Sequence, residues 1–183
     1  MSATAQHATI RPFFDEATNT VSYLVFDPAT RQGAVIDPVL DWDHRSGEAD
    51  TRSADALIEA ARREGITIAL ILETHAHADH LTAAPYIKQR CGGKIGIGEH
   101  IKDVQRIFRP VFAADDVKPE GGDFDLLFRD GERIALGTLE IEVIHTPGHT
   151  PACVCYRIGD DVFVGDTLFM HDYGTARADF PGG

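Results

Sequence analysis

Four side chains capable of binding a metal fall within six residues, directly after a short apolar segment. That segment, Ile68–Leu72, is the longest apolar run in the chain and has the character of a strand buried on both faces. In an extended chain the first two of the four project to the same side, and the following turn can bring the last two to an adjacent side. Neutral imidazole and carboxylate suit zinc or ferrous iron rather than calcium or magnesium. The four candidate ligands at this strand end are His75, His77, Asp79 and His80.

A second loop, with the sequence HTPGHT at residues 145–150, follows the predicted strand Leu139–Ile144. Pro147 presets the turn, and Gly148 permits a close approach of the backbone, so that His149 can point inward. Taken alone, such a loop is more often an ordinary turn than a ligand-bearing segment. It gains weight from its position at the end of a strand.

Asp166 also follows a predicted strand, Val162–Val164. A single carboxylate in this position is more often a helix cap or a surface residue. However, loops at strand ends gather at one rim of a sheet, so the three segments support one another as parts of a single site. The alternative is a set of polar loops with scattered histidines, but four metal-capable side chains rarely coincide at one strand end.

The order of predicted elements is a hairpin, then β/α units, then antiparallel strands, which indicates a mixed α/β sandwich in one domain over residues 1–183. Strands are predicted over Val21–Asp27, Gly33–Asp37, Thr67–Leu72, Lys94–Ile97, Arg133–Leu136, Leu139–Ile144, Cys153–Ile158 and Val162–Val164. Helices are predicted from an N-cap at Ser53 to Gly65, over Leu81–Arg90 and over Ile101–Phe108, with polar loops at Trp42–Arg52 and Asp115–Asp125.

The formal net charge of −12 makes nucleic acid and anionic membrane surfaces poor partners. An anionic small substrate would need a local cationic pocket or a metal. The three cysteines are few and odd in number, and the first nine residues carry no apolar secretory core, so we expect a cytoplasmic protein. Cys153 and Cys155 face the same way on a predicted strand, where core packing is favoured over metal binding. The lone histidines His7, His44, His100 and His145 are expected to be surface or satisfied polar residues.

The candidate ligands together resemble the metallo-β-lactamase superfamily, with HxHxDH at 75–80, then His149, then Asp166. Residues 71–81, 146–153, 165–169 and 172–183 are similar to a narrower branch. That branch holds the bacterial β-lactamase-related hydrolases and the glutathione-persulfide dioxygenases, which are relatives of glyoxalase II. The resemblance implies an αββα sandwich with the metal site at one edge of two sheets. It also implies that this α/β fold is incomplete at the C-terminus, because the family continues for further chain.

The resemblance implies two alternative ligand sets. In dinuclear members, the residues matching His75, His77 and His149 hold the first metal, those matching Asp79 and His80 hold the second with one more histidine, and the one matching Asp166 bridges. In persulfide dioxygenases a single ferrous iron is held by the residues matching His75, His149 and Asp166. The second set is complete in this chain, which favours one Fe(II) per chain. One or two Zn(II) ions are the alternative.

The function implied is oxidation of glutathione persulfide, or a related low-molecular-weight persulfide, by O2 to sulfite and thiol. A zinc-dependent thioester hydrolase of glyoxalase-II type is the alternative, and a catalytically impaired metal-binding fragment is the second alternative. With a single metal, Asp79 would act as a general base or orienting residue, and His77 as an orienting residue. Arg177 and Tyr173 match positions near the substrate pocket, although an ion pair and loop packing are their alternatives. Family analogy also suggests a homodimer.

Overall fold

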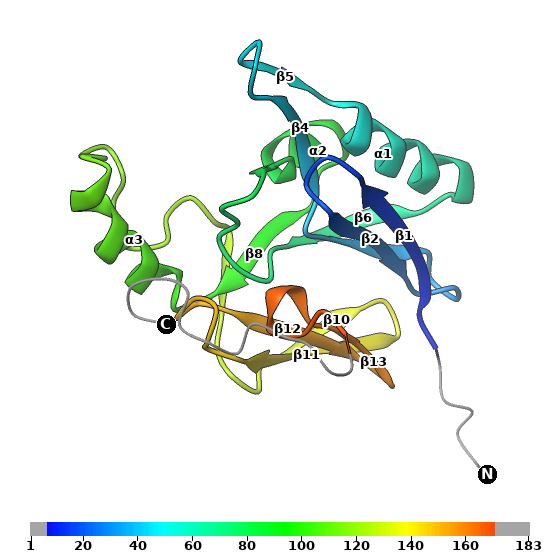
Figure 1. The fold of residues 1–183 in the computed structure, drawn as a ribbon. Coiled ribbons are helices and arrows are strands. Elements are labelled where there is room, and N and C mark those ends of the chain that lie inside the picture. The colour runs from blue at the N-terminus through cyan, green and yellow to red at the C-terminus, as the bar shows by residue number, and fades with distance from the viewer. Residues whose placement is uncertain (1–6, 171–183) are drawn as a thin grey trace. The chain divides into compact units, whose positions relative to one another are not determined.

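The computed structural model describes residues 7–170 of the 183-residue chain (Figure 1). Its internal contacts divide the chain into two compact units. The first unit comprises Met1–Leu72, His77–Ile95 and Ala135–Glu140, and the second comprises Glu73–Ala76, Gly96–Ile134 and Ile141–Gly183. The expected substrate-binding residues Tyr173 and Arg177 lie outside the described residues. The single domain over residues 1–183 stays a prediction.

Four strands of the first unit are neighbours in the order β1 (Thr9–Asp15), β2 (Thr20–Phe26), β3 (Gln32–Ile36) and β6 (Thr67–Leu72). The first three are antiparallel, while β6 runs parallel to β3. The predicted hairpin is therefore confirmed as β2 and β3. The predicted buried strand is β6, whose last three residues are fully buried or nearly so. Strand β1 was not predicted, because its alternating polar and apolar residues are mostly half-exposed.

Helix α1 (Arg52–Glu64) ends at Gly65, which adopts the left-handed conformation with φ 65° that glycine accommodates best. Its buried face consists of Ala54, Leu57, Ile58, Ala60 and Ala61. The prediction of Ser53 as the N-cap is wrong, because the helix begins at Arg52 and its N-cap, Thr51, lies two residues earlier. The hydroxyl of Ser53 instead donates to Oδ1 of Asp41 at 2.9 Å.

A small three-stranded sheet is found where the sequence predicted part of a polar loop and the start of a helix. Its order is β5 (Glu48–Asp50), β4 (Val39–Asp43) and β7 (Leu81–Thr82). Pairing of β7 with β4 draws residues 81 and 82 out of the predicted helix, so α2 spans only Ala84–Cys91. Figure 1 shows α1 alongside β4 in the same unit.

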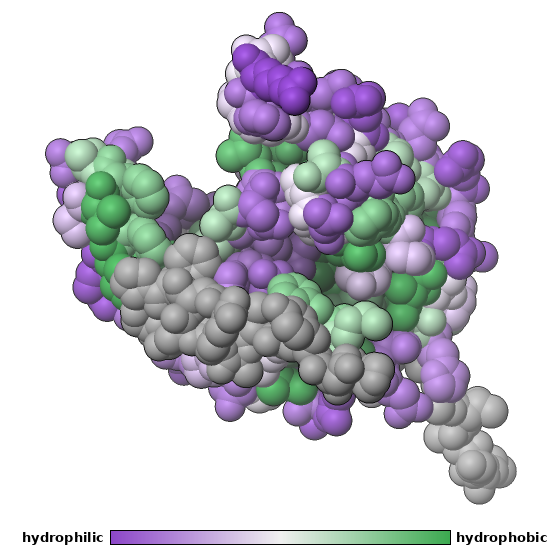
Figure 2. All heavy atoms as spheres, in the orientation of Figure 1, coloured by the Kyte–Doolittle hydropathy of each residue, from purple (hydrophilic) through white to green (hydrophobic). Residues whose placement is uncertain are grey.

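The second unit contains the parallel pairing of β8 (Lys94–Gly98) with β9 (Leu126–Phe128) and most residues of an antiparallel sheet. The sheet contains β10 (Arg133–Leu136), β11 (Leu139–His145), β12 (Val154–Ile158) and β13 (Asp161–Phe163), in that order, and a 3₁₀ turn, η1 (Gly165–Thr167), follows it. Helix α3 (Ile101–Val111) runs three residues beyond its predicted end. Figure 2 shows apolar residues on its outer end, where Phe112 is 72% exposed.

The carboxylate of Asp27 connects distant segments of the first unit through hydrogen bonds. It is 1% exposed and accepts hydrogen bonds from the amides of Ala29 and Thr138 and from the hydroxyls of Thr30 and Thr138, all at 2.7–2.8 Å. Burial raises the pKa of Asp27, but the four hydrogen bonds outweigh burial and hold the pKa well below its ordinary value. Gly137, with φ 65°, leaves this carboxylate room, because a Cβ there would lie 2.4 Å from Oδ2 of Asp27.

No helix within residues 7–170 has both the length and the apolar character needed to cross a membrane.

Candidate metal centre

Glu73 and Thr74, which follow β6 in the chain, are held in place by three hydrogen bonds within the second unit. Glu73 N–H donates to the carbonyl of Gly96 at 3.0 Å, and Val154 N–H donates to the carbonyl of Thr74 at 2.9 Å. The hydroxyl of Tyr156, a fully buried residue, donates to the carbonyl of Glu73 at 2.8 Å. These contacts fix the backbone next to the first histidine.

His75 is 2% exposed. Its Nδ1 lies 3.0 Å from the hydroxyl of Thr74, so Nε2 is the nitrogen that would bind a metal. A hydrogen bond to one imidazole nitrogen fixes the orientation of the ring and favours one tautomer. The side chain is therefore oriented by a neighbour in sequence.

His149 lies in the loop between β11 and β12, as predicted. Thr146 N–H donates to the carbonyl of Cys153 at 2.9 Å and closes the base of this loop. Gly148 N–H donates to the carbonyl of Thr150 at 3.2 Å and tightens the turn that carries the histidine. Nε2 of His149 then lies 3.5 Å from Oδ2 of Asp166.

Asp166 lies in η1, where Gly165 is in close contact with Thr74 of the same unit. Gly165 has φ 48°, and a Cβ on it would lie 2.4 Å from Oγ1 of Thr74. Only glycine avoids this overlap, so the residue before Asp166 allows η1 to approach the segment that carries His75.

The structure brings His75, His149 and Asp166 together, since one ligand atom of each lies within 4.8 Å of the others. The two imidazole rings are edge to face, with centroids 5.0 Å apart and planes at 89°. Two histidines and one carboxylate are the ligand set that non-haem ferrous oxygenases use, in which the iron keeps open positions for substrate and O2.

A second group forms within the first unit from His77, Asp79 and His80, again with one ligand atom of each within 4.8 Å of the others. Nε2 of His77 lies 3.1 Å from Oδ1 of Asp37, and Nδ1 lies 4.0 Å from Oδ1 of Asp79. The carboxylate of Asp37 thus favours protonation of His77 at Nε2, so Nδ1 is the nitrogen that would bind a metal. Asp79 is half exposed and accepts a hydrogen bond from the hydroxyl of Thr20 at 3.1 Å.

His80 provides the test of whether this second group fits a metal. Its Nδ1 donates to the carbonyl of Leu81 at 2.9 Å, so Nε2 carries a lone pair. That Nε2 is buried and has no hydrogen-bond partner within residues 7–170. Burial, followed by the proximity of His77, lowers the pKa of His80 and favours the neutral form that binds metals. An unprotonated, buried nitrogen without a partner fits a metal ligand.

Asp37 was interpreted from the sequence only as the end of a strand. The structure gives it a larger role, because its side chain is 6% exposed and contacts His77. Its backbone has φ 48°, and Ser22 Oγ donates to its carbonyl at 2.7 Å. The available signal was its position: like Asp166, it is a carboxylate directly after a strand.

Cys153 and Cys155 are buried and free, as expected of a strand core, and neither belongs to a group of three candidate ligands in the described chain. Burial raises the pKa of the Cys153 thiol, so it stays protonated. Two of the histidines expected to be surface or satisfied polar residues, His100 and His145, have partners. The rings of His100 and His145 stack with centroids 4.4 Å apart, and Nε2 of His145 donates to the carbonyl of Pro151 at 3.0 Å.

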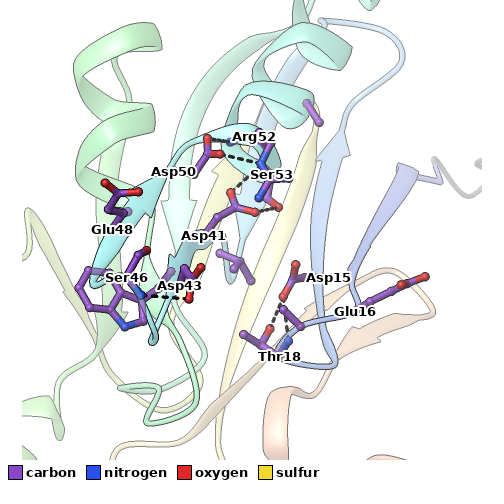
Figure 3. Close-up of a pocket in the computed structure, with 15 residues that line it drawn as sticks. Asp15, Glu16, Thr18, Asp41, Asp43, Ser46, Glu48, Asp50, Arg52 and Ser53 are labelled. Carbon is purple, nitrogen blue, oxygen red and sulfur yellow. Dashed lines mark hydrogen bonds and ion pairs between the residues drawn. The ribbon is translucent and has the colours of Figure 1, made fainter.

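A cavity of about 690 Å³ opens elsewhere in the first unit (Figure 3). Its lining is rich in acidic residues, and none of the candidate ligands lines it. Figure 3 shows several of the carboxylates bound to neighbouring backbone amides or hydroxyls. They include those of Asp15, Asp41 and Asp43, which Thr18, Ser53 and Ser46 approach. These carboxylates stabilise local turns, and the cavity disfavours an anionic ligand.

Comparison with known proteins agrees with this geometry. The model of the metallo-beta-lactamase superfamily matches residues 16–183. A "probable metallo-hydrolase" of Burkholderia pseudomallei is 50% identical over 186 residues, which cover 96% of this chain and 63% of the relative. "Glyoxylase B2" of Dictyostelium discoideum is 44% identical, covering 96% and 61%. Mouse "persulfide dioxygenase ETHE1, mitochondrial" is 27% identical, covering 100% and 60%.

Among solved structures, ETHE1 from Myxococcus xanthus aligns with a TM-score of 0.69 and 26% identity, over 92% of this chain and 64% of that one. The chain therefore belongs to the metallo-β-lactamase superfamily, and the expected α/β metallo-β-lactamase fold is confirmed. Its relatives in that superfamily are named as a metallo-hydrolase, a glyoxylase and a persulfide dioxygenase. The chain spans between about two fifths and two thirds of the length of the curated relatives it matches.

Proposed function

We propose that the chain oxidises a low-molecular-weight persulfide, of the glutathione type, with O2 at a single ferrous iron. The observation that carries this proposal is the group formed by His75, His149 and Asp166, a two-histidine, one-carboxylate set contained in one unit. Iron in such a set supplies open coordination positions at which O2 chemistry can occur. The likeness to the two ETHE1 proteins supports the same assignment.

The reaction balances without a further reductant. One persulfide, one O2 and one water give one thiol, one sulfite and two protons. The outer sulfur loses four electrons, and O2 gains them as the S–S bond breaks and the thiol leaves. The chain's own residues orient the site and receive protons. Thr74 fixes the ring of His75, and the half-exposed carboxylate of Asp79 is available as a proton acceptor.

Substrate recognition is the finer part of the proposal. We assign it to Arg177, whose guanidinium can pair with a glutathione carboxylate, and to Tyr173. In a chain of net charge −12, a cation near the site would offset the repulsion of an anionic substrate. The cytoplasm is the proposed compartment, because three free cysteines suit a reducing environment. A homodimer is the proposed assembly.

A zinc-dependent thioester hydrolase of glyoxalase-II type is the second candidate. The unpartnered Nε2 of His80, in its group with His77 and Asp79, favours it because that group offers ligands for a further metal. The identity of 44–50% to relatives named as a metallo-hydrolase and a glyoxylase points the same way. Zinc would supply Lewis acidity to a thioester carbonyl.

The deciding experiment measures metal content and turnover on the same preparation. The chain is purified anaerobically from cells supplied with iron and zinc, and its metals are counted by elemental analysis. About one iron per chain, with O2 uptake and sulfite release on adding glutathione persulfide, is the expected result. Two zinc ions per chain with hydrolysis of S-lactoylglutathione would replace the proposal with the hydrolase. Bound metal without either turnover would establish the impaired fragment.

A further inference from the structure

The loop that carries His149 and the turn that carries Asp166 are joined by a side-chain contact. Oγ1 of Thr146, three residues before His149, lies 2.9 Å from Oγ1 of Thr167, directly after Asp166. Both hydroxyls are partly buried. Neither residue is a candidate ligand, so their contact connects the two segments and does not itself bind a metal.

The contact is one link in a closed circuit of hydrogen bonds. Thr146 Oγ1 also lies 3.4 Å from Sγ of Cys155 on β12, and that Sγ lies 3.8 Å from the carbonyl of Val164. The carbonyl of Val164 in turn accepts from Thr167 N–H at 3.1 Å. The circuit therefore runs from η1 to the His149 loop, on to β12 and back to η1.

The direction of each hydrogen bond follows from the carbonyl oxygen of Val164, which can only accept. A carbonyl oxygen has no proton, so the Cys155 thiol donates to Val164 and leaves its sulfur lone pairs free to accept. Thr146 then donates to Cys155, and its oxygen accepts from Thr167. Every proton in the circuit has one position, and no hydroxyl is left to rotate between alternatives.

We propose that Thr146, Cys155 and Thr167 are positioning residues that set the separation between His149 and Asp166. This proposal rests on the proposed metal site. The ligand atoms of His149 and Asp166 lie 3.5 Å apart, and the circuit crosses directly from one ligand-bearing segment to the other. A circuit of this kind resists displacement because breaking one link leaves a partly buried polar group without its hydrogen bond. Contacts behind metal ligands typically change metal affinity by 10–100-fold.

The test uses substitutions that keep shape and remove one hydroxyl. In the full 183-residue chain, Thr146→Val and Thr167→Val delete the hydroxyl without changing volume, while Thr146→Ser and Thr167→Ser retain it. Thr138→Val is the matched control, because it removes a comparable hydroxyl bond to Asp27 in the first unit. Cobalt(II) is the probe metal. Its dissociation constant is measured by competition with a chelator, and its visible spectrum reports coordination geometry.

We expect each valine variant to weaken cobalt binding by about tenfold and to shift the visible bands. Each serine variant should restore both properties. The double valine variant should bind no more weakly than either single variant, because removing both partners leaves no orphaned hydroxyl. Thr138→Val should lower the melting temperature without changing affinity or spectrum.

Two results overturn the proposal, and they differ from each other. If the valine variants bind cobalt like the unmodified chain, the circuit does not position the ligands, and the metal site itself stands. If the unmodified chain binds no cobalt, the proposed function fails together with the positioning role.

Discussion

Nε2 of His77 lies 3.1 Å from Oδ1 of Asp37, and the side chains of both residues are more than nine-tenths buried. The two residues are 40 positions apart in the chain, one after β3 and the other after β6. A buried carboxylate behind a histidine fixes the ring orientation and raises the basicity of the other nitrogen. The pair therefore prepares Nδ1 of His77 to act as a ligand.

Replacing Asp37 with Asn tests this pair. Asparagine tolerates the positive φ of the position, so the backbone need not change. Its amide removes the negative charge and allows the imidazole to adopt the other tautomer. We expect metal affinity at the group of His77, Asp79 and His80 to fall by about 10–100-fold. The control is Asp41→Asn, a cavity carboxylate bonded to Ser53, and equal losses in both variants would contradict the role of Asp37.

The close approach of η1 to Thr74 predicts the effect of Gly165→Ala. The new Cβ would lie 2.4 Å from Oγ1 of Thr74, so η1 and Asp166 must move. Gly159→Ala is the matched control, because Gly159 also has a positive φ, 62°, but open space around it. Both variants should lose about 1–2 kcal/mol through backbone strain, and only Gly165→Ala should also lose metal at the group of His75. Calorimetry and elemental analysis measure the two effects, and metal retained in Gly165→Ala would refute the prediction.

Substitution of single histidines distinguishes one metal from two. With a single iron held by His75, His149 and Asp166, His75→Ala should purify without iron. His80→Ala should keep about one iron per chain and most of its O2 uptake. A metal count that falls by half in His80→Ala, with loss of turnover, would instead favour a dinuclear centre.

The buried carboxylate of Asp27 predicts a specific acid sensitivity. Its folded pKa is lower than its unfolded pKa of about 3.9. Its ionised form therefore stabilises the fold above about pH 4, and this stability is lost as the pH falls from there towards the folded pKa. At pH 7, Asp27→Asn should lower the free energy of unfolding by about 2 kcal/mol, because an amide group would face a donor.

Below pH 4 the difference between Asp27→Asn and the unmodified chain should shrink. Urea unfolding at a series of pH values measures it. The exposed Asp116→Asn should show no such dependence. A difference that stays constant across the pH series would show that the charge of Asp27 is not responsible.

The candidate ligands at the strand ends could be predicted from the sequence because each lies close in the chain to the strand that it follows. His75, His149 and Asp166 each follow an apolar run that is a strand in the structure, and this rule alone was enough to expect them together. The element boundaries near Leu81 were wrong because β7 pairs with β4, whose partner residues are more than 40 positions away in the chain. Local helix signals cannot report such a pairing.

The side chains that contact the candidate ligands and their loops could not be predicted from the sequence either. Asp37 and the hydroxyl circuit of Thr146 and Thr167 depend on contacts between loops that no spacing rule connects. Cys155 was expected to be an apolar strand residue, yet its thiol both donates and accepts a hydrogen bond. Side chains that orient ligands show no periodicity, so only coordinates reveal them.

The four bonds to Asp27 also affect how the chain folds as it is synthesised. Asp27 and Thr138 are 111 residues apart. At about 5–20 residues per second, a ribosome needs roughly 6–22 seconds to make the intervening chain. Until Thr138 emerges, the carboxylate lacks half of its donors, and burying it early would carry an uncompensated charge. We therefore expect the turn that carries Asp27 to stay open to solvent until residue 138 has been synthesised.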